Sequence, residues 1–92
     1  MHYRIPKVHH EAGNQNKLVE VLESRVKTFD GLIYVRLVSV SDMVTIAISE
    51  YESEALLDKV EPRFRELMID LMPLMPGPPE VHNGDVFWDH EN

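Results

Sequence analysis

Two strand-forming segments joined by a very short turn constrain the fold of this chain most strongly. Residues 32–40 and 43–51 are rich in β-branched and aromatic side chains, which favour β-strands. Only Ser41 and Asp42 separate these segments, so the sequence predicts a β-hairpin. Because neighbouring strand residues point to opposite sides of a sheet, the hairpin has two faces whose chemistry can be compared.

The two faces of the hairpin are expected to differ. One is predicted to be apolar and to pack under helices, with the side chains of Ile33, Val35, Leu37, Val44, Ile46 and Ile48. The other is predicted to be mixed, with Tyr34, Arg36, Val38, Thr45, Ala47 and Ser49. A mixed face of this kind indicates a second surface that is covered but partly polar.

The segments on either side of the hairpin supply further elements. Residues 3–8 are predicted to form a short strand, and a helix is expected to begin after Asn14 or Asn16 and to end near Phe29. The apolar residues of this helix recur at spacings of three and four, which is the pattern of one helical face. The chain therefore starts as strand, helix and hairpin.

A second helix and a final strand complete the pattern. Ser53 is the predicted cap of this helix, and Pro62 is expected to break it into two pieces because proline removes a helical hydrogen bond. Asn83-Gly84 reads as a turn, followed by a short strand over residues 86–88. The order βαββαβ predicts one α+β domain over residues 1–92, ferredoxin-like, with a four-stranded antiparallel sheet.

Length and composition bound the class of protein. A chain of 92 residues can form only a small hydrophobic core, and this chain contains no cysteine for disulfides or thiolate metal sites. We therefore expect a homodimer whose second copy covers the open face of the sheet. The net charge of −7 argues against nucleic-acid binding, and no apolar run approaches the roughly 20 residues of a membrane span. A cytoplasmic location is expected.

The sequence suggests no metal or cofactor. His9, His10 and Glu11 are consecutive, and adjacent residues of an extended segment point to opposite sides, so they are interpreted as a surface turn. Glycine-rich phosphate loops and nucleophile elbows are absent from the sequence. We therefore expect the purified protein to carry neither metal nor chromophore.

Five side chains are candidates to line a cavity or to bind a ligand there: Tyr34, Arg36, Tyr51, His82 and Trp88. Arg36 is the most informative, because a guanidinium within an apolar strand needs a carboxylate or an anionic ligand. Two interpretations of Arg36 remain open. It forms a salt bridge, for which Glu50 is one candidate partner, or it binds an enolate, phenolate or carboxylate group of a ligand.

Several segments resemble the antibiotic-biosynthesis-monooxygenase-like family of dimeric α+β barrel proteins. They are residues 30–32 (DGL), 49–56 (SEYESEAL) and 62–64 (PRF), and the likeness extends from about Tyr3 to Trp88. The resemblance implies that two sheets pack face to face to form a barrel. It also implies one of several activities, because the family includes cofactor-independent monooxygenases, haem-degrading enzymes and proteins without a known activity.

This chain departs from the characterised enzymes of that family. The haem-degrading members use an Asn on the first strand with a Trp and a His from the second-helix region, and none of these is present here. The only tryptophan is Trp88. No catalytic residue of the family is therefore assigned to this chain, and a role in handling haem is the least supported of the candidate functions.

Two functions remain open from the sequence. The first is a cofactor-independent monooxygenase acting on a small aromatic or enolisable substrate, which needs a dry cavity, a base and a group that stabilises an anion. The second is a non-catalytic homodimer that binds a small apolar or aromatic molecule, or that only assembles. Whether the protein is an enzyme is not decided at this point.

Overall fold

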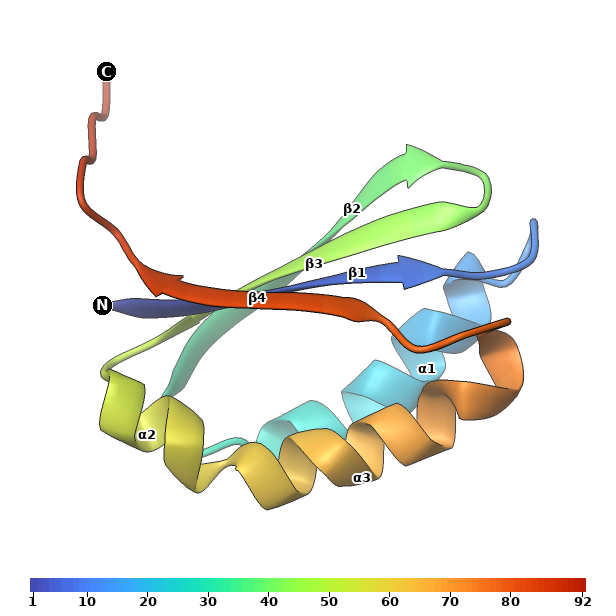
Figure 1. Ribbon diagram of the computed structural model, residues 1–92, viewed down its shortest axis with the longest axis horizontal. Helices are drawn as coiled ribbons and strands as arrows, with labels where there is room; N and C mark the ends of the chain where they lie inside the picture. The colour runs from blue at the N-terminus through green and yellow to red at the C-terminus, as the bar shows by residue number, and fades with distance from the viewer.

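The computed structural model describes residues 1–92 and places helices on one face of a four-stranded sheet (Figure 1). The strands are β1 (His2–His9), β2 (Leu32–Ser41), β3 (Val44–Tyr51) and β4 (Glu80–Asp85). The helices are α1 (Gln15–Arg25), α2 (Glu54–Lys59) and α3 (Glu61–Leu71), with short 3₁₀ turns η1 (Val26–Thr28) and η2 (Met72–Leu74). The strand order β2-β3-β1-β4, antiparallel throughout, confirms the predicted ferredoxin-like α+β fold.

The helix boundaries follow from local chemistry. Ser53 has an extended backbone, and its hydroxyl accepts a hydrogen bond from the Leu56 N–H at 3.1 Å, which caps α2 as predicted. Pro62 lies in the first turn of α3, where a missing N–H costs nothing, and the helix breaks between α2 and α3 at Val60. The predicted division into two helical pieces is therefore confirmed.

The prediction of which hairpin residues face the helices is correct for β2 and wrong for β3. The partners across β2 and β3 are Val35 with Ser49, Leu37 with Ala47 and Arg36 with Ile48. Residues opposite each other in an antiparallel pair share a face. The helix-covered face therefore combines the apolar residues of β2 with the small and hydroxyl residues of β3. Ile46 and Ile48 lie on the open face, with Tyr34, Arg36 and Val38. The pairing differs from the predicted one because the register of β2 against β3 shifts between Leu32 and Tyr34 and again between Ser39 and Ser41.

The last strand is also displaced from its predicted position. β4 covers Glu80–Asp85 and pairs with β1 from His2↔Asp85 to Lys7↔Glu80. Asn83 and Gly84 lie inside this strand, because pairing with β1 overrides their turn preference. Residues 86–88, which were predicted to be the strand, belong to an extended tail that leaves the body of the molecule (Figure 1).

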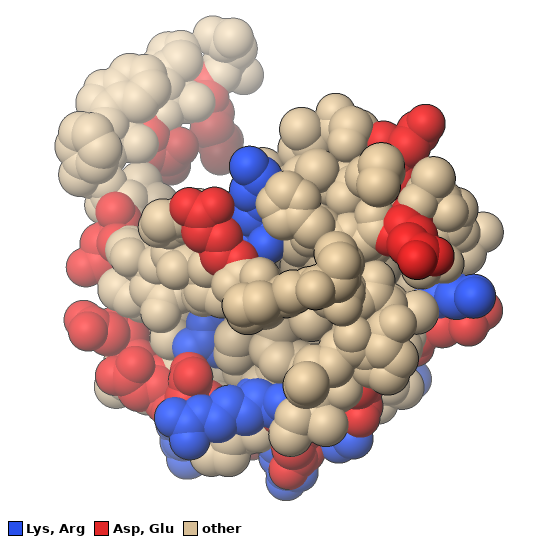
Figure 2. All heavy atoms as spheres, turned by 45° about the vertical axis from the view of Figure 1, so that its right-hand side comes forward, with Lys and Arg blue, Asp and Glu red and all other residues tan.

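The core lies between the sheet and the helices. Its buried apolar residues are Val8, Leu18, Phe29, Tyr51, Leu57, Val60, Phe64, Leu67 and Leu71. No helix covers the opposite face of the sheet (Figure 1). Figure 2 shows acidic and basic side chains mixed along the helical side of the molecule. None of the helices is both long enough and apolar enough to cross a bilayer.

Gly31→Ala is expected to destabilise the fold more than Gly13→Ala. Both glycines have positive φ values, +82° and +87°, where an L side chain costs about 1–2 kcal/mol. A Cβ at Gly31 would also lie 2.8 Å from the Leu56 Cβ, whereas a Cβ at Gly13 meets nothing within 4 Å. Overpacking adds about 1–3 kcal/mol, so chemical denaturation should separate the two variants by that amount. Equal losses would show that Leu56 moves aside freely.

Candidate functional site

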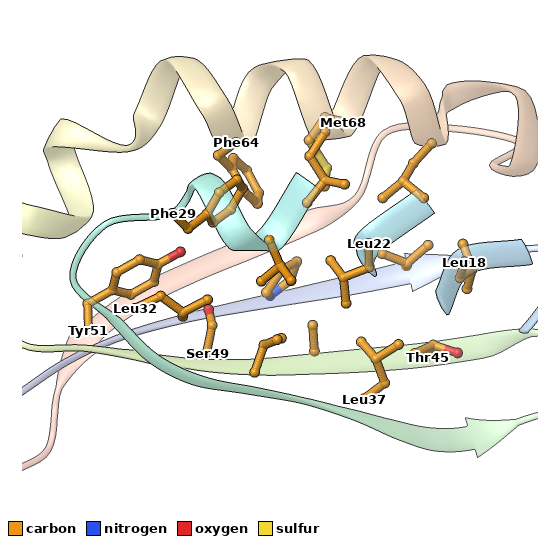
Figure 3. Close-up of a pocket in the computed structure, with 17 residues that line it drawn as sticks. Leu18, Leu22, Phe29, Leu32, Leu37, Thr45, Ser49, Tyr51, Phe64 and Met68 are labelled. Carbon is orange, nitrogen blue, oxygen red and sulfur yellow. The ribbon is translucent and has the colours of Figure 1, made fainter. Parts of the chain in front are cut away.

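A cavity between the helices and the covered face of the sheet is the candidate functional site (Figure 3). Its wall has 17 residues, of which 14 are hydrophobic. The cavity volume is about 60 Å³, and the empty space is about 620 Å³ when the open mouth is included. The cavity is therefore apolar and narrow.

Two layers of structure build this cavity, the helices and the sheet. Leu18 and Leu22 of α1 and Met68 of α3 point down from the helices (Figure 3). The sheet supplies the floor, with Pro6 and Val8 of β1 below the helices. The remaining sheet residues of the wall are Leu32, Val35, Leu37, Thr45, Ala47, Ser49 and Tyr51. The swapped register of the hairpin explains why β3 contributes small and hydroxyl side chains, which leave room where isoleucines would fill it.

One end of the cavity carries the Tyr51 hydroxyl. The Tyr51 side chain is almost completely buried and points into the cavity (Figure 3). Burial raises the pKa of the hydroxyl above its ordinary value, against the opposing effects of the Arg4 guanidinium and of Ser49. Tyr51 is therefore a neutral hydrogen-bond donor at physiological pH.

Arg4 is a buried cation behind this end of the cavity. Its side chain is only 2% exposed, it forms an ion pair with Glu61, and its guanidinium lies 4.0 Å from the centroid of the Phe64 ring. The Phe64 ring itself lines the cavity. The Arg4 Nε and Nη1 atoms have no hydrogen-bond partner in the protein. A positive charge thus lies behind the aromatic wall, next to Tyr51.

The other end of the cavity carries Thr45, which is hydrogen-bonded to the buried His10. The Thr45 Oγ1 lies 2.9 Å from His10 Nε2, and His10 Nδ1 lies 2.9 Å from the carbonyl oxygen of Glu11. His10 is 1% exposed. The predicted surface turn is therefore wrong for His10, because the residue follows β1 with its side chain on the helix side of the sheet, whereas His9 is exposed.

A second hollow adjoins the cavity at the Thr45 end. Three residues belong to both, Leu18, Leu37 and Thr45. The rest of its wall contains neutral polar side chains from the start of α1 and from β2, and the Gln15 Nε2 donates a hydrogen bond to the Ser39 Oγ at 2.7 Å. The apolar cavity therefore continues into a more polar hollow at one end.

Of the five residues that the sequence nominated, only Tyr51 lines this cavity. Tyr34 and Arg36 lie on the open face of the sheet, where the Arg36 guanidinium is 3.9 Å from the centroid of the Tyr34 ring. No ion pair joins Arg36 to Glu50. The Tyr34 and Tyr3 hydroxyls are hydrogen-bonded at 3.2 Å, and this bond, burial and Glu50 raise the pKa of Tyr3.

The other two nominated residues lie outside the cavity. His82 is exposed on β4 and bonds to Glu80 at 2.9 Å, which lowers the pKa of the Glu80 carboxyl. Trp88 is 73% exposed in the C-terminal tail and stacks on His90. No group of three His, Asp or Glu side chains lies close enough to hold a metal ion.

Sequence reasoning missed the residues that give this site its polarity, which are Arg4, His10 and Thr45. A weak signal was present, since Arg4, Pro6, Val8 and His10 alternate along one strand and so share a face. That face could be assigned to the helices only once the pairing of β1 with β3 was known.

No protein-family model matches the sequence, and no curated protein matches it significantly. Solved structures do share its fold. A monooxygenase from Streptomyces coelicolor, in complex with nanaomycin D, superposes with a TM-score of 0.81 over 99% of this chain and 91% of that one, at 20% identity. A protein of unknown function from Nitrosomonas europaea gives 0.75 over 99% and 93%, at 12% identity.

A further similar structure is that of a protein from Caulobacter crescentus whose assignment as an antibiotic biosynthesis monooxygenase is provisional. It superposes with a TM-score of 0.73 over 95% of this chain and 90% of that one, at 17% identity. These likenesses confirm, at the level of the fold, the resemblance to monooxygenase-like α+β proteins. They include proteins with and without a stated activity.

Proposed function

We propose that the cavity takes up a small aromatic or enolisable molecule and that the protein oxidises it with molecular oxygen as a cofactor-independent monooxygenase. The observation that carries this proposal is the cavity itself, an apolar space between sheet and helices with the Tyr51 hydroxyl at one end. The shared fold with the Streptomyces coelicolor monooxygenase, which was solved with nanaomycin D, supports the same reading.

Such a reaction needs no reductant, because the substrate supplies the electrons. An activated methylene group and one O₂ give a carbonyl group and one water, so one oxygen atom enters the product and the other leaves as water. The substrate must first lose a proton, and the resulting carbanion or enolate passes electrons to oxygen. The protein contributes a dry site, a proton acceptor and groups that stabilise the anion.

Tyr51 and Arg4 suit the stabilising role. Tyr51 stays protonated and can donate a hydrogen bond to an oxygen atom of the ligand. The Arg4 charge lies behind Phe64 and favours negative charge in this part of the cavity. Their effect is largest where water is excluded, since charge interactions are weakly screened there.

The cavity must widen to hold a ring system. A cavity of about 150 Å³ admits benzene in a protein core, and the cavity volume here is only about 60 Å³. Met68 is in the wall, and its unbranched thioether side chain can move between rotamers at low cost. Ligands of one to three fused rings are therefore expected to bind with a rearrangement of the helix side of the wall.

Ala47→Leu tests this function by filling the cavity from β3. We expect the parent protein to consume oxygen with 2-tetralone, to yield the 1,2-diketone, and to incorporate label from isotopically labelled O₂. Ala47→Leu should lose most of this activity, because three added carbons occupy the ligand space. Ile48→Leu is the matched control on the opposite face of the same strand, and it should keep the activity.

Oxygen electrode traces with mass spectrometry of the product give the measurement. Saturable 2-tetralone binding without oxygen uptake would support the non-catalytic ligand-binding reading instead. Activity in Ala47→Leu equal to that of the parent would place the reaction outside this cavity.

We also propose that the protein is a homodimer whose two open sheet faces pack together. The open face carries Tyr3 and Ile5 of β1, Val38 of β2 and Ile46 and Ile48 of β3, and no helix covers it. Ile5 and Val38 are 37% and 44% exposed. Covering such a face is expected to bury more than about 1,200 Å² in total, the lower range of stable interfaces.

A further inference from the structure

The partners of His10 determine which of its ring nitrogens carries the proton. A backbone carbonyl only accepts hydrogen bonds, so the contact with the Glu11 oxygen requires a proton on Nδ1. In the neutral ring Nε2 then has a free lone pair, and it accepts the hydrogen bond that the Thr45 hydroxyl donates. Both contacts come from neutral groups, and the backbone N–H of His10 is bonded to the Met43 carbonyl at 3.0 Å.

Thr45 connects this histidine to the ligand space. The residue lines both the apolar cavity and the polar hollow, at the place where they join. Because its proton points to His10, the Thr45 oxygen offers its lone pairs to a donor on the other side. A ligand hydroxyl near Leu18 and Leu37 would therefore donate a hydrogen bond to the Thr45 oxygen, which is itself hydrogen-bonded to the base His10.

We propose that Thr45 and His10 form a proton relay that deprotonates a phenol or an enol bound in the cavity. The ligand O–H proton passes to the Thr45 oxygen while the Thr45 proton passes to His10 Nε2. The ligand becomes a phenolate or enolate, Thr45 is unchanged, and His10 becomes an imidazolium that still donates to the Glu11 carbonyl.

This inference rests on the proposed function, because it supplies the proton acceptor which that reaction requires. It also narrows the substrate class to molecules with an acidic hydroxyl or an enol form. Thr45 and Tyr51 are six residues apart on β3, about 20 Å of strand, and Tyr51 points back toward the cavity. A ligand that contacts both ends is therefore elongated, and Tyr51 donates to a different oxygen atom of the ligand from the one that the relay deprotonates.

Two probes separate the relay from ligand binding as such. The probe 4-nitrophenol has a yellow phenolate, and its methyl ether 4-nitroanisole cannot lose a proton. At a mildly acidic pH, binding to the parent protein should raise the phenolate-to-phenol ratio of 4-nitrophenol by about tenfold over the free probe, which corresponds to one pKa unit. 4-Nitroanisole should bind without this colour change.

His10→Gln should abolish the rise in phenolate and leave 4-nitroanisole affinity unchanged, because glutamine keeps a hydrogen-bonding group but takes up no proton. His9→Gln is the matched control at the exposed neighbouring residue, and it should behave like the parent. Thr45→Val should also lose the effect, and Thr45→Ser should restore it. With 2-tetralone, the kcat of His10→Gln should fall by about 10²–10⁴-fold with KM little changed.

The outcomes are distinguishable. An unchanged phenolate ratio in His10→Gln or in Thr45→Val would overturn the relay while leaving the cavity as a binding site. Binding of both probes to the parent with no rise in phenolate would overturn it as well. Failure of the parent to bind either probe would instead overturn the proposed function.

Discussion

Glu61→Ala is expected to lower the free energy of unfolding by about 2–4 kcal/mol, because it leaves the Arg4 guanidinium buried without its partner. The Arg4 side chain is 2% exposed, its Nη2 atom bonds to Glu61, and its Nε and Nη1 atoms have no hydrogen-bond partner in the protein. The loss is set somewhat below that of a fully buried pair because the Glu61 side chain is 38% exposed and partly solvated. Chemical denaturation at a fixed protein concentration measures the effect.

A double variant isolates the cause. Arg4→Met keeps much of the side-chain volume and its packing on Phe64 while removing the charge. Arg4→Met combined with Glu61→Ala should therefore be more stable than Glu61→Ala alone, which is the behaviour of a buried ion pair replaced by apolar residues. Additive losses in the double variant would show that Arg4 stabilises the fold independently of Glu61.

Ile46→Lys is expected to convert the protein from dimer to monomer at micromolar concentration. Ile46 lies on the open face of a central strand beside Lys7, so the new charge meets a like charge and would be desolvated in the dimer. A cost of about 3 kcal/mol per subunit occurs twice by two-fold symmetry, which raises the dissociation constant by about 10⁴-fold. Sedimentation velocity distinguishes the two species.

Ile69→Lys is the matched control for this prediction. Ile69 is a 63% exposed isoleucine on α3, on the helical side of the molecule. This variant should sediment like the parent. A parent protein that sediments at 10.7 kDa would contradict the homodimer itself, and an Ile46→Lys dimer would place the interface on another surface.

The fold was predictable because its signals are local. The hairpin, the Ser53 cap and the break before Pro62 each depend on residues within a few positions, and the structure contains all three. The order of elements then identified the ferredoxin-like topology. The position of the last strand was not predictable in this way, because β4 depends on pairing with β1, at the other end of the chain.

The candidate site was less predictable, because it depends on the register between strands. A shift of one residue exchanges the two faces of a strand. Alternation alone paired Val35 and Leu37 with the isoleucines of β3, while the structure pairs them with Ser49 and Ala47. Tyr51 was identified because tyrosine is an amphipathic side chain that suits a cavity wall, and His10 was missed because its burial depends on helices that pack over the sheet.

An NMR titration of the isotopically labelled protein with 4-nitroanisole tests directly whether this cavity is the ligand site. We expect saturable shifts at residues of the cavity wall, such as Leu22, Ala47 and Met68. Residues of the open face, such as Ile5 and Ile46, should be unaffected. Shifts confined to the open face, or no saturable shift at any residue, would contradict the assignment of this cavity as the ligand site.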